Sequence, residues 1–332
     1  MIAMSIAEPG PVEGGPLRRI EKPVPEPGSG EVLIRVSVCG ACHTDLHIAE
    51  GEIELPRLPI VPGHQAVGTV ERSGPGATRW SVGERVGAAW LNRTCGACGF
   101  CRRGAENLCD GARFTGYHVD GGYAEYLVML EEYVYSIPKR YSDILAAPLL
   151  CAGIIGYRAL RCAGTVPGDR LALFGFGASA HITLQIARHR GCEVFVFTRS
   201  KDHQRLALSL GAAWAGQAGE TAPSLVDRAI LFAPAGRLIP LALRALRKGG
   251  TLASAVIHLD RIPEMDYSLL FEERVLRTVT ASTRRDGEEF LEEAAAADVR
   301  IETVVYPLAD ANRALARIKA SLVSGAAVLQ VG

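Results

Sequence analysis

Residues 95–109 read CGACGFCRRGAENLC, and this short stretch holds four cysteines: Cys95, Cys98, Cys101 and Cys109. The C-x2-C-x2-C-x7-C spacing lets one loop wrap four thiolates around a tetrahedral ion, with metal–sulfur distances of about 2.3 Å. Iron–sulfur clusters also use repeated C-x2-C spacing, but they normally require a different fourth spacing. Disulfide pairing is the remaining reading of such a cluster. The spacing predicts a closed structural zinc site in a lobe over residues 91–113.

Length, charge and cysteine usage limit the class of protein. The chain has 332 residues, about twice the usual length of a domain, which favours two domains. Its formal net charge is zero, so electrostatics favours neither a nucleic-acid partner nor an anionic membrane. The start lacks the pattern of a signal peptide, and the longest uncharged run, 171–187, is too short and too polar to span a bilayer. Nine cysteines, clustered beside His and Asp, suit a reducing compartment, and we expect a cytoplasmic protein.

The predicted secondary-structure pattern changes near residue 141. Before it, alternating or apolar runs at 31–38, 66–71 and 84–88 are separated by Gly and Pro, which is typical of short strands. After it, apolar strands alternate with helical segments: strands at 170–174 and 193–197, helices at 180–189 and 202–210. This alternation predicts βαβ units and a parallel sheet. The sequence therefore predicts a β-rich domain followed by an α/β domain.

Three further residues, scattered along the chain, could form a second metal site. Cys42 follows a predicted strand, His64 precedes another, and Cys151 lies just before the α/β region. Two thiolates and one imidazole leave a fourth position open, as a catalytic zinc requires. Such a zinc would act as a Lewis acid that lowers the pKa of an alcohol towards neutrality and so prepares hydride release.

A glycine turn between a strand and a helix indicates a dinucleotide site. The turn reads GFGASA over residues 175–180, with Gly175, Gly177 and Ala180 at the fingerprint positions. In this context backbone N–H groups cradle a pyrophosphate, and alanine is accepted at the third position.

The strand after this turn suggests which dinucleotide binds. It ends in Thr198, Arg199, Ser200 and Lys201, where an acidic residue would be expected for a free ribose 2′-hydroxyl. Two cations suit a 2′-phosphate, because the arginine guanidinium can bind it bidentately. The turn therefore favours NADP(H) over NAD(H). Alternatively, Arg199 stacks on adenine and Lys201 is solvated, in which case both cofactors bind.

Several segments in order resemble the zinc-dependent alcohol dehydrogenases of the medium-chain dehydrogenase/reductase family. They are CGACHTDLH at 39–47, PIVPGH at 59–64, the four-cysteine lobe, DGGYAEY at 120–126, PLLCAG at 148–153 and the glycine turn. The resemblance implies a GroES-like β-rich catalytic domain over 1–152 and 284–332, interrupted by a doubly wound Rossmann domain over 153–283. It also implies a homo-oligomer, either dimer or tetramer, that acts on a small-molecule alcohol or aldehyde.

The resemblance also implies roles for the residues around Cys42. The residue matching Thr44 passes the alcohol proton through a ribose hydroxyl to the residue matching His47. Asp45 matches a carboxylate that orients the zinc histidine, a role that makes chemical sense for His64. His43 matches a position that faces the cofactor pyrophosphate.

Two departures from the family pattern bear on the substrate. Gln65 follows His64 where a glutamate is usual, so exchange of the zinc ligands is expected to differ here. Ile53 stands where small-alcohol enzymes of this type often carry tryptophan, which implies a wider pocket. With Trp90 it would line an apolar pocket for a medium-sized or aromatic substrate. A zinc-independent quinone or enoyl reductase and a non-catalytic NADPH-binding sensor are the alternatives, but neither needs both ligand sets together with Thr44 and His47.

Overall fold

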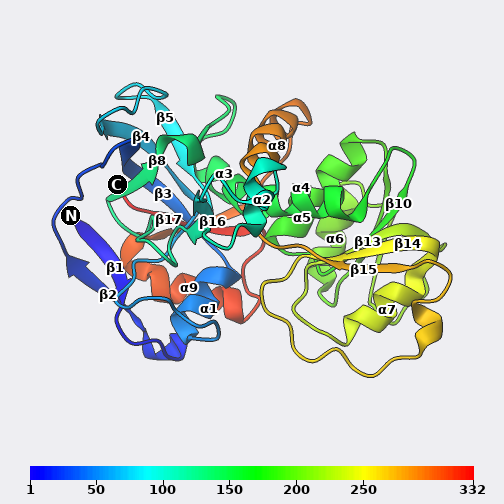
Figure 1. Ribbon diagram of the computed structural model, residues 1–332. Helices are drawn as coiled ribbons and strands as arrows, with labels where there is room; N and C mark the ends of the chain where they lie inside the picture. Colours follow the sequence, from blue (N-terminus) through cyan, green and yellow to red (C-terminus); the bar gives the residue numbers. More distant parts are fainter. The chain divides into compact units, whose positions relative to one another are not determined.

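The structure is a computed structural model that describes residues 1–332, and its internal contacts divide the chain into two compact units. The first unit comprises Met1–Cys151, Ala281–Glu292 and Ile301–Gly332. The second comprises Ala152–Thr280 and Glu293–Arg300. Figure 1 shows the course of the chain through both.

The last part of this division differs from the expected boundaries, which placed 284–332 wholly in the catalytic domain. Residues 293–300 belong to the second unit because two residues there bind its helix α5 (Ala178–His189) and the turn after it. Arg190 donates two hydrogen bonds of 2.7 Å to the carboxylate of Glu293. Gln185 donates to the carbonyl of Arg300 at 2.8 Å and accepts its N–H at 2.8 Å.

A largely antiparallel sheet forms the core of the first unit, in the order β16-β17-β3-β4-β5-β9, with β8 also paired to β3. The predicted strand at 31–38 continues to Ala41, because residues beyond Val38 pair with β17 and β4. The strands are β3 (Glu31–Ala41), β4 (Ala66–Ser73), β5 (Arg85–Ala88), β8 (Tyr126–Leu130), β9 (Val134–Ser136), β16 (Thr303–Pro307) and β17 (Ala326–Gln330).

Helices and two small hairpins complete the first unit. Helix α1 (His43–Glu50) follows β3 directly and packs against α9 (Ala311–Lys319) (Figure 1). Two antiparallel pairs were not anticipated from the sequence: β1 (Ile2–Ile6) with β2 (Leu17–Glu21), and β6 (Leu91–Arg93) with β7 (Arg113–Phe114). The second pair closes the base of the four-cysteine lobe, so the predicted lobe is a hairpin insertion.

The second unit is a parallel six-stranded sheet in the order β12-β11-β10-β13-β14-β15, the doubly wound order of a Rossmann fold. Strands β10 and β11 have the predicted bounds, and apolar runs bury them on both faces. The strands are β10 (Arg170–Phe174), β11 (Glu193–Phe197), β12 (Trp214–Gly216), β13 (Val226–Leu231), β14 (Leu246–Ser254) and β15 (Val275–Thr278). The GroES-like plus Rossmann prediction is confirmed.

Helices cover both faces of this sheet. Helices α4 (Ala152–Ala163) and α5 (Ala178–His189) pack against each other on one side, and α7 (Leu238–Ala245) lies on the other (Figure 1). Helix α6 (Lys201–Ser209) packs on β11 and β12. The glycine turn between β10 and α5 thus lies at the carboxyl end of a central strand, where open α/β sheets bind ligands.

One segment, Asp143–Ala163, is long and apolar enough to pass a length-and-composition test for a membrane span. In the structure it is broken into α3 (Asp143–Ala146), η4 (Ala147–Leu150) and α4. Within its most apolar window 67% is buried inside the protein. The segment is therefore buried core.

Candidate active site

Three ligand side chains converge in the first unit from three separate places in the chain. Cys42 lies between β3 and α1, His64 lies just before β4, and Cys151 follows η4. His64 Nε2 is 3.5 Å from Cys42 Sγ and 3.2 Å from Cys151 Sγ. Donors bound tetrahedrally to one zinc ion are about 3.6 Å apart, given bond lengths of about 2.0–2.3 Å. The three donors therefore fit zinc and leave its fourth position open.

Asp45 contacts the loops that carry Cys42 and His64, on the side of His64 away from the sulfurs. Its Oδ2 accepts the N–H of Cys42 at 2.9 Å, and its Oδ1 accepts the N–H of Gly63 at 3.1 Å. Oδ1 also lies 3.4 Å from His64 Nδ1, and both side chains are almost completely buried. One carboxylate thus binds the backbone at two ligand loops and faces the ring nitrogen of His64 opposite the sulfurs. The arrangement leaves Nε2 as the ligand atom.

The electrostatics of this pocket also suit a cation. Hydrogen bonding to Cys151 and then burial raise the pKa of the Cys42 thiol well above its ordinary value. A zinc ligand, however, must be a thiolate. A divalent ion supplies the positive charge that compensates for the buried thiolates.

The four cysteines of the lobe form a second, closed donor set. Their sulfurs lie within 4.8 Å of one another, and Cys101 Sγ is 3.5 Å from Cys98 Sγ and 3.9 Å from Cys95 Sγ. Backbone N–H groups point at the sulfurs, for example from Cys98 to Cys95 at 3.3 Å. Hydrogen bonds from the N–H groups of Ala97 and Cys98 lower the pKa of Cys95 to about 6. The N–H groups around Cys95 thus favour its thiolate form, and the four sulfurs form the donor set of a structural zinc.

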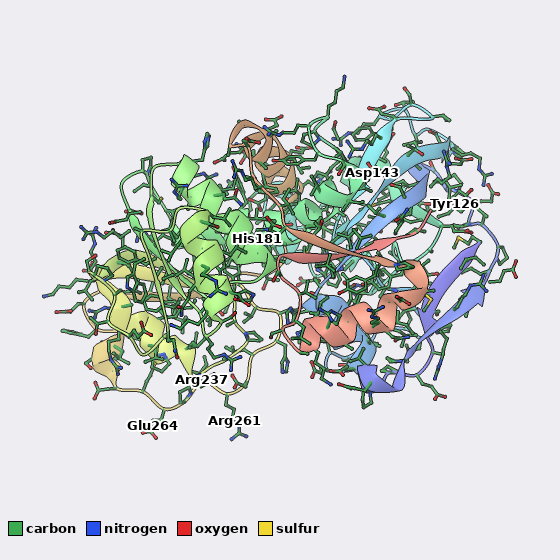
Figure 2. All side chains as sticks on the ribbon, turned by 180° about the vertical axis from the view of Figure 1, so that it is seen from behind. Tyr126, Asp143, His181, Arg237, Arg261 and Glu264 are labelled. Carbon is green, nitrogen blue, oxygen red and sulfur yellow. The ribbon has the colours of Figure 1, made fainter.

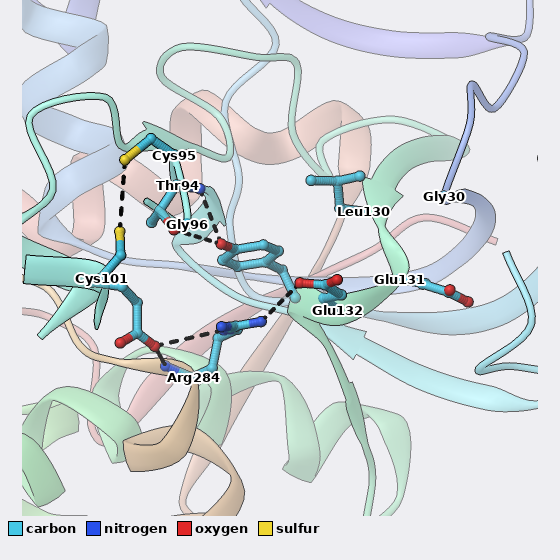
Figure 3. Close-up of a pocket in the computed structure, with 11 residues that line it drawn as sticks. Gly30, Thr94, Cys95, Gly96, Cys101, Leu130, Glu131, Glu132 and Arg284 are labelled. Atoms are coloured by element: carbon cyan, nitrogen blue, oxygen red, sulfur yellow. Dashed lines mark hydrogen bonds and ion pairs between the residues drawn. The ribbon is translucent and has the colours of Figure 1, made fainter. Parts of the chain in front are cut away.

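A cavity of about 240 Å³ lies beside this lobe (Figure 3). Arg284 donates to Glu132 Oε2 at 3.0 Å, while its backbone N–H donates to Glu106 Oε1 at 3.0 Å. Its guanidinium also stands 4.8 Å from the ring centroid of Tyr133, whose hydroxyl accepts the N–H of Thr94 at 3.0 Å. The cavity contains none of the three catalytic ligands. Its polar groups tie the zinc lobe to α8 (Arg284–Ala296) and to η3 (Glu131–Tyr133).

A cluster of aromatic rings lies beside the buried zinc histidine. The ring centroid of Trp90 lies 4.8 Å from that of His64, in an edge arrangement at 71°. Phe114 stacks on Trp90 at 4.9 Å and 10°, and Tyr117 is tilted against it at 5.8 Å. Ile53 is partly buried and packs against the same hydrophobic core as Trp90. Sequence reasoning identified Trp90 and Ile53 but missed Phe114 and Tyr117, which the aromatic run FTGYH at 114–118 could have indicated.

The residues expected to move a proton lie on α1. Thr44 is half-buried in the first turn, and His43 beside it is exposed. His47, one turn further along, is buried, and its Nδ1 is paired with the Glu52 carboxylate. The ring centroids of His43 and His47 are 6.4 Å apart. Sequence reasoning did not identify Glu52, although a carboxylate just after the glycine that ends a helix is a usable signal.

The glycine turn of the second unit contains two glycines, and the structure constrains the two positions differently. Gly175 has φ of 93°, and a Cβ there would come within 2.9 Å of Ala233 N and Cβ. The fold itself therefore requires glycine at this position. Gly177 is the N-cap residue of α5, has an ordinary φ of −107°, and a Cβ there would meet nothing within 4 Å. Packing therefore does not require glycine at position 177.

Ala180 and His181 follow in the first turn of α5, and both are buried. Ala180 is fully covered, consistent with close packing of helix and strand. His181, labelled in Figure 2, places its Nδ1 3.3 Å from the carbonyl oxygen of Gly177. Burial lowers its pKa to about 4, so the ring is neutral and serves the turn through a backbone contact.

The turn after β11 presents the residues expected to select the cofactor. Thr198 is buried, and its carbonyl accepts a hydrogen bond from Gln204 Nε2 at 2.9 Å. Arg199 and Lys201 are exposed, and Lys201 Nζ donates to Gln204 Oε1 at 3.1 Å. Gln204 therefore fixes the turn from its buried side, and the two cations remain accessible to an anion.

Comparison with known proteins identifies the class of enzyme. Residues 28–139 match the family model described as alcohol dehydrogenase GroES-like domain. A protein named Probable alcohol dehydrogenase AdhA, from Mycobacterium tuberculosis (strain CDC 1551 / Oshkosh), is 48% identical over 100% of this chain and 97% of its own length.

Two solved structures agree with this family in fold. A cobalt- and zinc-bound thermostable alcohol dehydrogenase from Pyrobaculum aerophilum aligns with a TM-score of 0.89 at 27% identity, over 100% of this chain and 99% of its own. A cinnamyl alcohol dehydrogenase from Sorghum bicolor aligns with a TM-score of 0.89 at 26% identity, over 99% and 97% of the two chains.

These findings and the two ligand sets define a zinc enzyme that interconverts alcohols and carbonyl compounds. The chain belongs to the zinc-containing medium-chain alcohol dehydrogenases. Cys42, His64 and Cys151 form its catalytic zinc site, and the four cysteines of the lobe form its structural zinc site. The complete ligand sets argue against a zinc-independent reductase and against a sensor that only binds a nucleotide.

Proposed function

We propose that this alcohol dehydrogenase prefers NADP(H) and acts on medium-sized or aromatic alcohols and aldehydes. The observation that carries the substrate class is an aromatic wall in which Trp90 contacts His64 and Phe114 stacks on Trp90. Zinc at the catalytic site would act as a Lewis acid towards the alcohol, and the nicotinamide would accept the hydride.

The wall favours a flat apolar group next to the reacting carbon. Aromatic pairs gain about 0.5–1.5 kcal/mol beyond the burial of their surface, which would distinguish a benzyl-type substrate from an aliphatic one of similar size. Isoleucine at position 53 is smaller than tryptophan and leaves room for such a group. The fold similarity to an enzyme named for cinnamyl alcohol supports this choice.

Other residues of the chain would orient the zinc ligand, transfer the proton and bind the cofactor. Asp45 orients His64, and Thr44 would donate the alcohol proton through a ribose hydroxyl to His47. His43, Gly175, Gly177 and Ala180 would contact or accommodate the pyrophosphate. Thr198, Arg199 and Lys201 would select the 2′-phosphate. Gln65 cannot offer zinc the carboxylate that a glutamate at this position would, so ligand exchange should depend on water.

A homo-oligomer, dimer or tetramer, in the cytoplasm is part of the same proposal. Strand β15 is the last strand of the Rossmann sheet, and Val275 in it is 46% exposed. A free edge with an exposed apolar side chain is a common pairing surface.

The substrate class is tested by initial rates across primary, secondary and aromatic alcohols and aldehydes with each cofactor. We expect kcat/KM for benzyl-type alcohols to exceed that for short aliphatic alcohols by about tenfold, the factor that 1.4 kcal/mol corresponds to. Trp90→Ala should remove most of this preference and leave ethanol oxidation within about threefold. Equal kcat/KM for both alcohol classes in the wild type would refute the aromatic substrate class.

The proton relay is tested by His47→Gln. This change removes the terminal proton acceptor and leaves the metal site intact, so alcohol oxidation should slow by about 10-fold to 100-fold. Small amine buffers should partly restore the rate, because they can take the proton in place of the imidazole. The rate with and without amines, at equal zinc content, is the measurement. A mutant as fast as the wild type would leave His47 without a role in catalysis.

A further inference from the structure

We propose that Glu52 is a positioning residue for the proton relay, which holds His47 by Nδ1 and leaves Nε2 to accept the proton. This inference rests on the proposed relay through Thr44 and His47. It adds a side chain that belongs to neither metal site and lies outside α1.

The end of α1 brings Glu52 back over His47. Gly51 adopts a left-handed conformation with φ of 72°, and its N–H donates to the carbonyl of Ile48 at 3.3 Å. The N–H of Glu52 donates to the carbonyl of His47 at 3.0 Å. These two bonds are the pair that defines a Schellman motif, in which the chain reverses over the last helical turn. Glu52 is thus fixed above His47 by its own backbone.

The side chains of these two residues then meet. Glu52 Oε2 pairs with His47 Nδ1, so the two residues are joined through both backbone and side chain. The side chain of His47 is 8% exposed, whereas that of Glu52 is 43% exposed. The imidazole is therefore enclosed, and the carboxylate that holds it reaches solvent.

This contact determines which nitrogen can act as a base. An ionised carboxylate only accepts hydrogen bonds, so the neutral imidazole donates Nδ1–H to Glu52 and carries its lone pair on Nε2. Without an acceptor at Nδ1, both tautomers are available and part of the enzyme presents an N–H where a base is needed. A carboxylate behind a histidine serves in this way in other enzymes.

The surroundings keep the geometry rigid. Glu50 Oε1 accepts the N–H of Val12 at 2.9 Å and pairs with Lys319 Nζ at 2.8 Å. The carbonyl of Ala49 accepts the N–H of Gly10 at 2.9 Å. The last turn of α1 is thus held by the N-terminal segment and by α9, next to the chain reversal at Gly51.

Alcohol oxidation removes one hydride and one proton from the substrate. The C–H bond would break to give the hydride to a bound oxidised nicotinamide, and the O–H bond breaks to release the proton. An N–H bond forms at Nε2 of His47 after transfer through Thr44 and the ribose hydroxyl. The imidazolium that results donates to the Glu52 carboxylate, which offsets its charge until the proton passes to solvent.

The first test is Glu52→Ala, with Glu54→Ala as the matched control, since Glu54 is an exposed glutamate two residues away. Glu52→Ala should lower kcat for alcohol oxidation by about 5-fold and change KM by less than about 2-fold. Glu54→Ala should match the wild type. Glu52→Gln, whose amide oxygen can still accept Nδ1–H, should recover part of the loss. Equal rates for Glu52→Ala and the wild type would overturn the proposal.

A double-mutant comparison separates positioning from a structural role. If Glu52 acts only through His47, Glu52→Ala should cost nothing further in a His47→Gln background. The same loss in both backgrounds would make Glu52 a structural cap and overturn the proposal. If His47→Gln alone leaves the rate unchanged, the relay itself fails, which is a different result.

A spectroscopic test does not depend on turnover. In nitrogen-labelled histidine spectra of the zinc-loaded protein, the signals missing from His47→Gln identify His47. The wild type should show protonated Nδ1 and unprotonated Nε2, and Glu52→Ala should shift the ring towards a mixture of tautomers. A wild-type ring protonated on Nε2 would contradict the assignment.

Discussion

Cys42→Ala is expected to abolish alcohol oxidation and to leave the fold nearly unchanged. Cys42 supplies one of only three protein donors to the catalytic zinc. A zinc ion contributes several kcal/mol to stabilising the charge that develops on the substrate oxygen, so its loss should slow turnover by about 10³-fold or more. Elemental analysis should find about two zinc ions per chain in the wild type and about one in the variant. Normal activity with one zinc per chain in the wild type would refute the catalytic assignment.

The structural site provides the matched control. Cys98→Ser removes one of four donors from the lobe, where the metal contributes to folding free energy directly. This variant should also lose one zinc per chain, but its main effect should be a lower free energy of unfolding. Thermal unfolding of the two variants therefore distinguishes the sites: Cys98→Ser should melt well below the wild type and Cys42→Ala close to it.

Arg199→Ala should weaken NADPH binding by about 10-fold to 150-fold and change NADH binding little. Hydrogen bonds to charged groups are worth about 1.5–3 kcal/mol, and NADPH offers the exposed guanidinium of Arg199 a 2′-phosphate that NADH lacks. Dissociation constants for both nucleotides, measured by titration, give the answer directly. If the wild type uses NADH as efficiently as NADPH, Arg199 does not select the cofactor.

Thr198→Asp examines the same preference from the opposite direction. An aspartate at the end of β11 would accept hydrogen bonds from ribose hydroxyls and would repel a 2′-phosphate. The variant should therefore favour NADH. The buried position of Thr198 makes the folding of this variant a necessary control, which a thermal melt provides.

Local sequence patterns predicted those parts of the enzyme whose chemistry is local. The spacing of the lobe cysteines specified one closed site, and the family segments identified Cys42, His64 and Cys151. Strands β10 and β11 matched their predicted bounds because runs of four apolar residues, each preceded by a charged residue and bounded by turns, have few alternatives.

Local sequence patterns did not predict contacts between residues far apart in the chain. The pairing of β17 with β3 and the stacking of Phe114 on Trp90 join residues far apart in the chain. The pairing of Arg190 with Glu293 assigns the end of α8 to the second unit, although nothing in the sequence of α8 marks that point. Glu52 and His47 are only five residues apart in the sequence, but their contact depends on the left-handed conformation of Gly51, which the sequence alone left undetermined.

All three donors of the catalytic zinc belong to the first unit, and Cys151 is its last residue before the chain enters the second. The glycine turn at 175–180 and the turn after β11 that carries Arg199 and Lys201 belong wholly to the second unit. Mutations that retune the nucleotide preference can therefore accumulate without disturbing the metal chemistry. Within one lineage, the choice of nucleotide and the range of substrates can therefore evolve as independent traits.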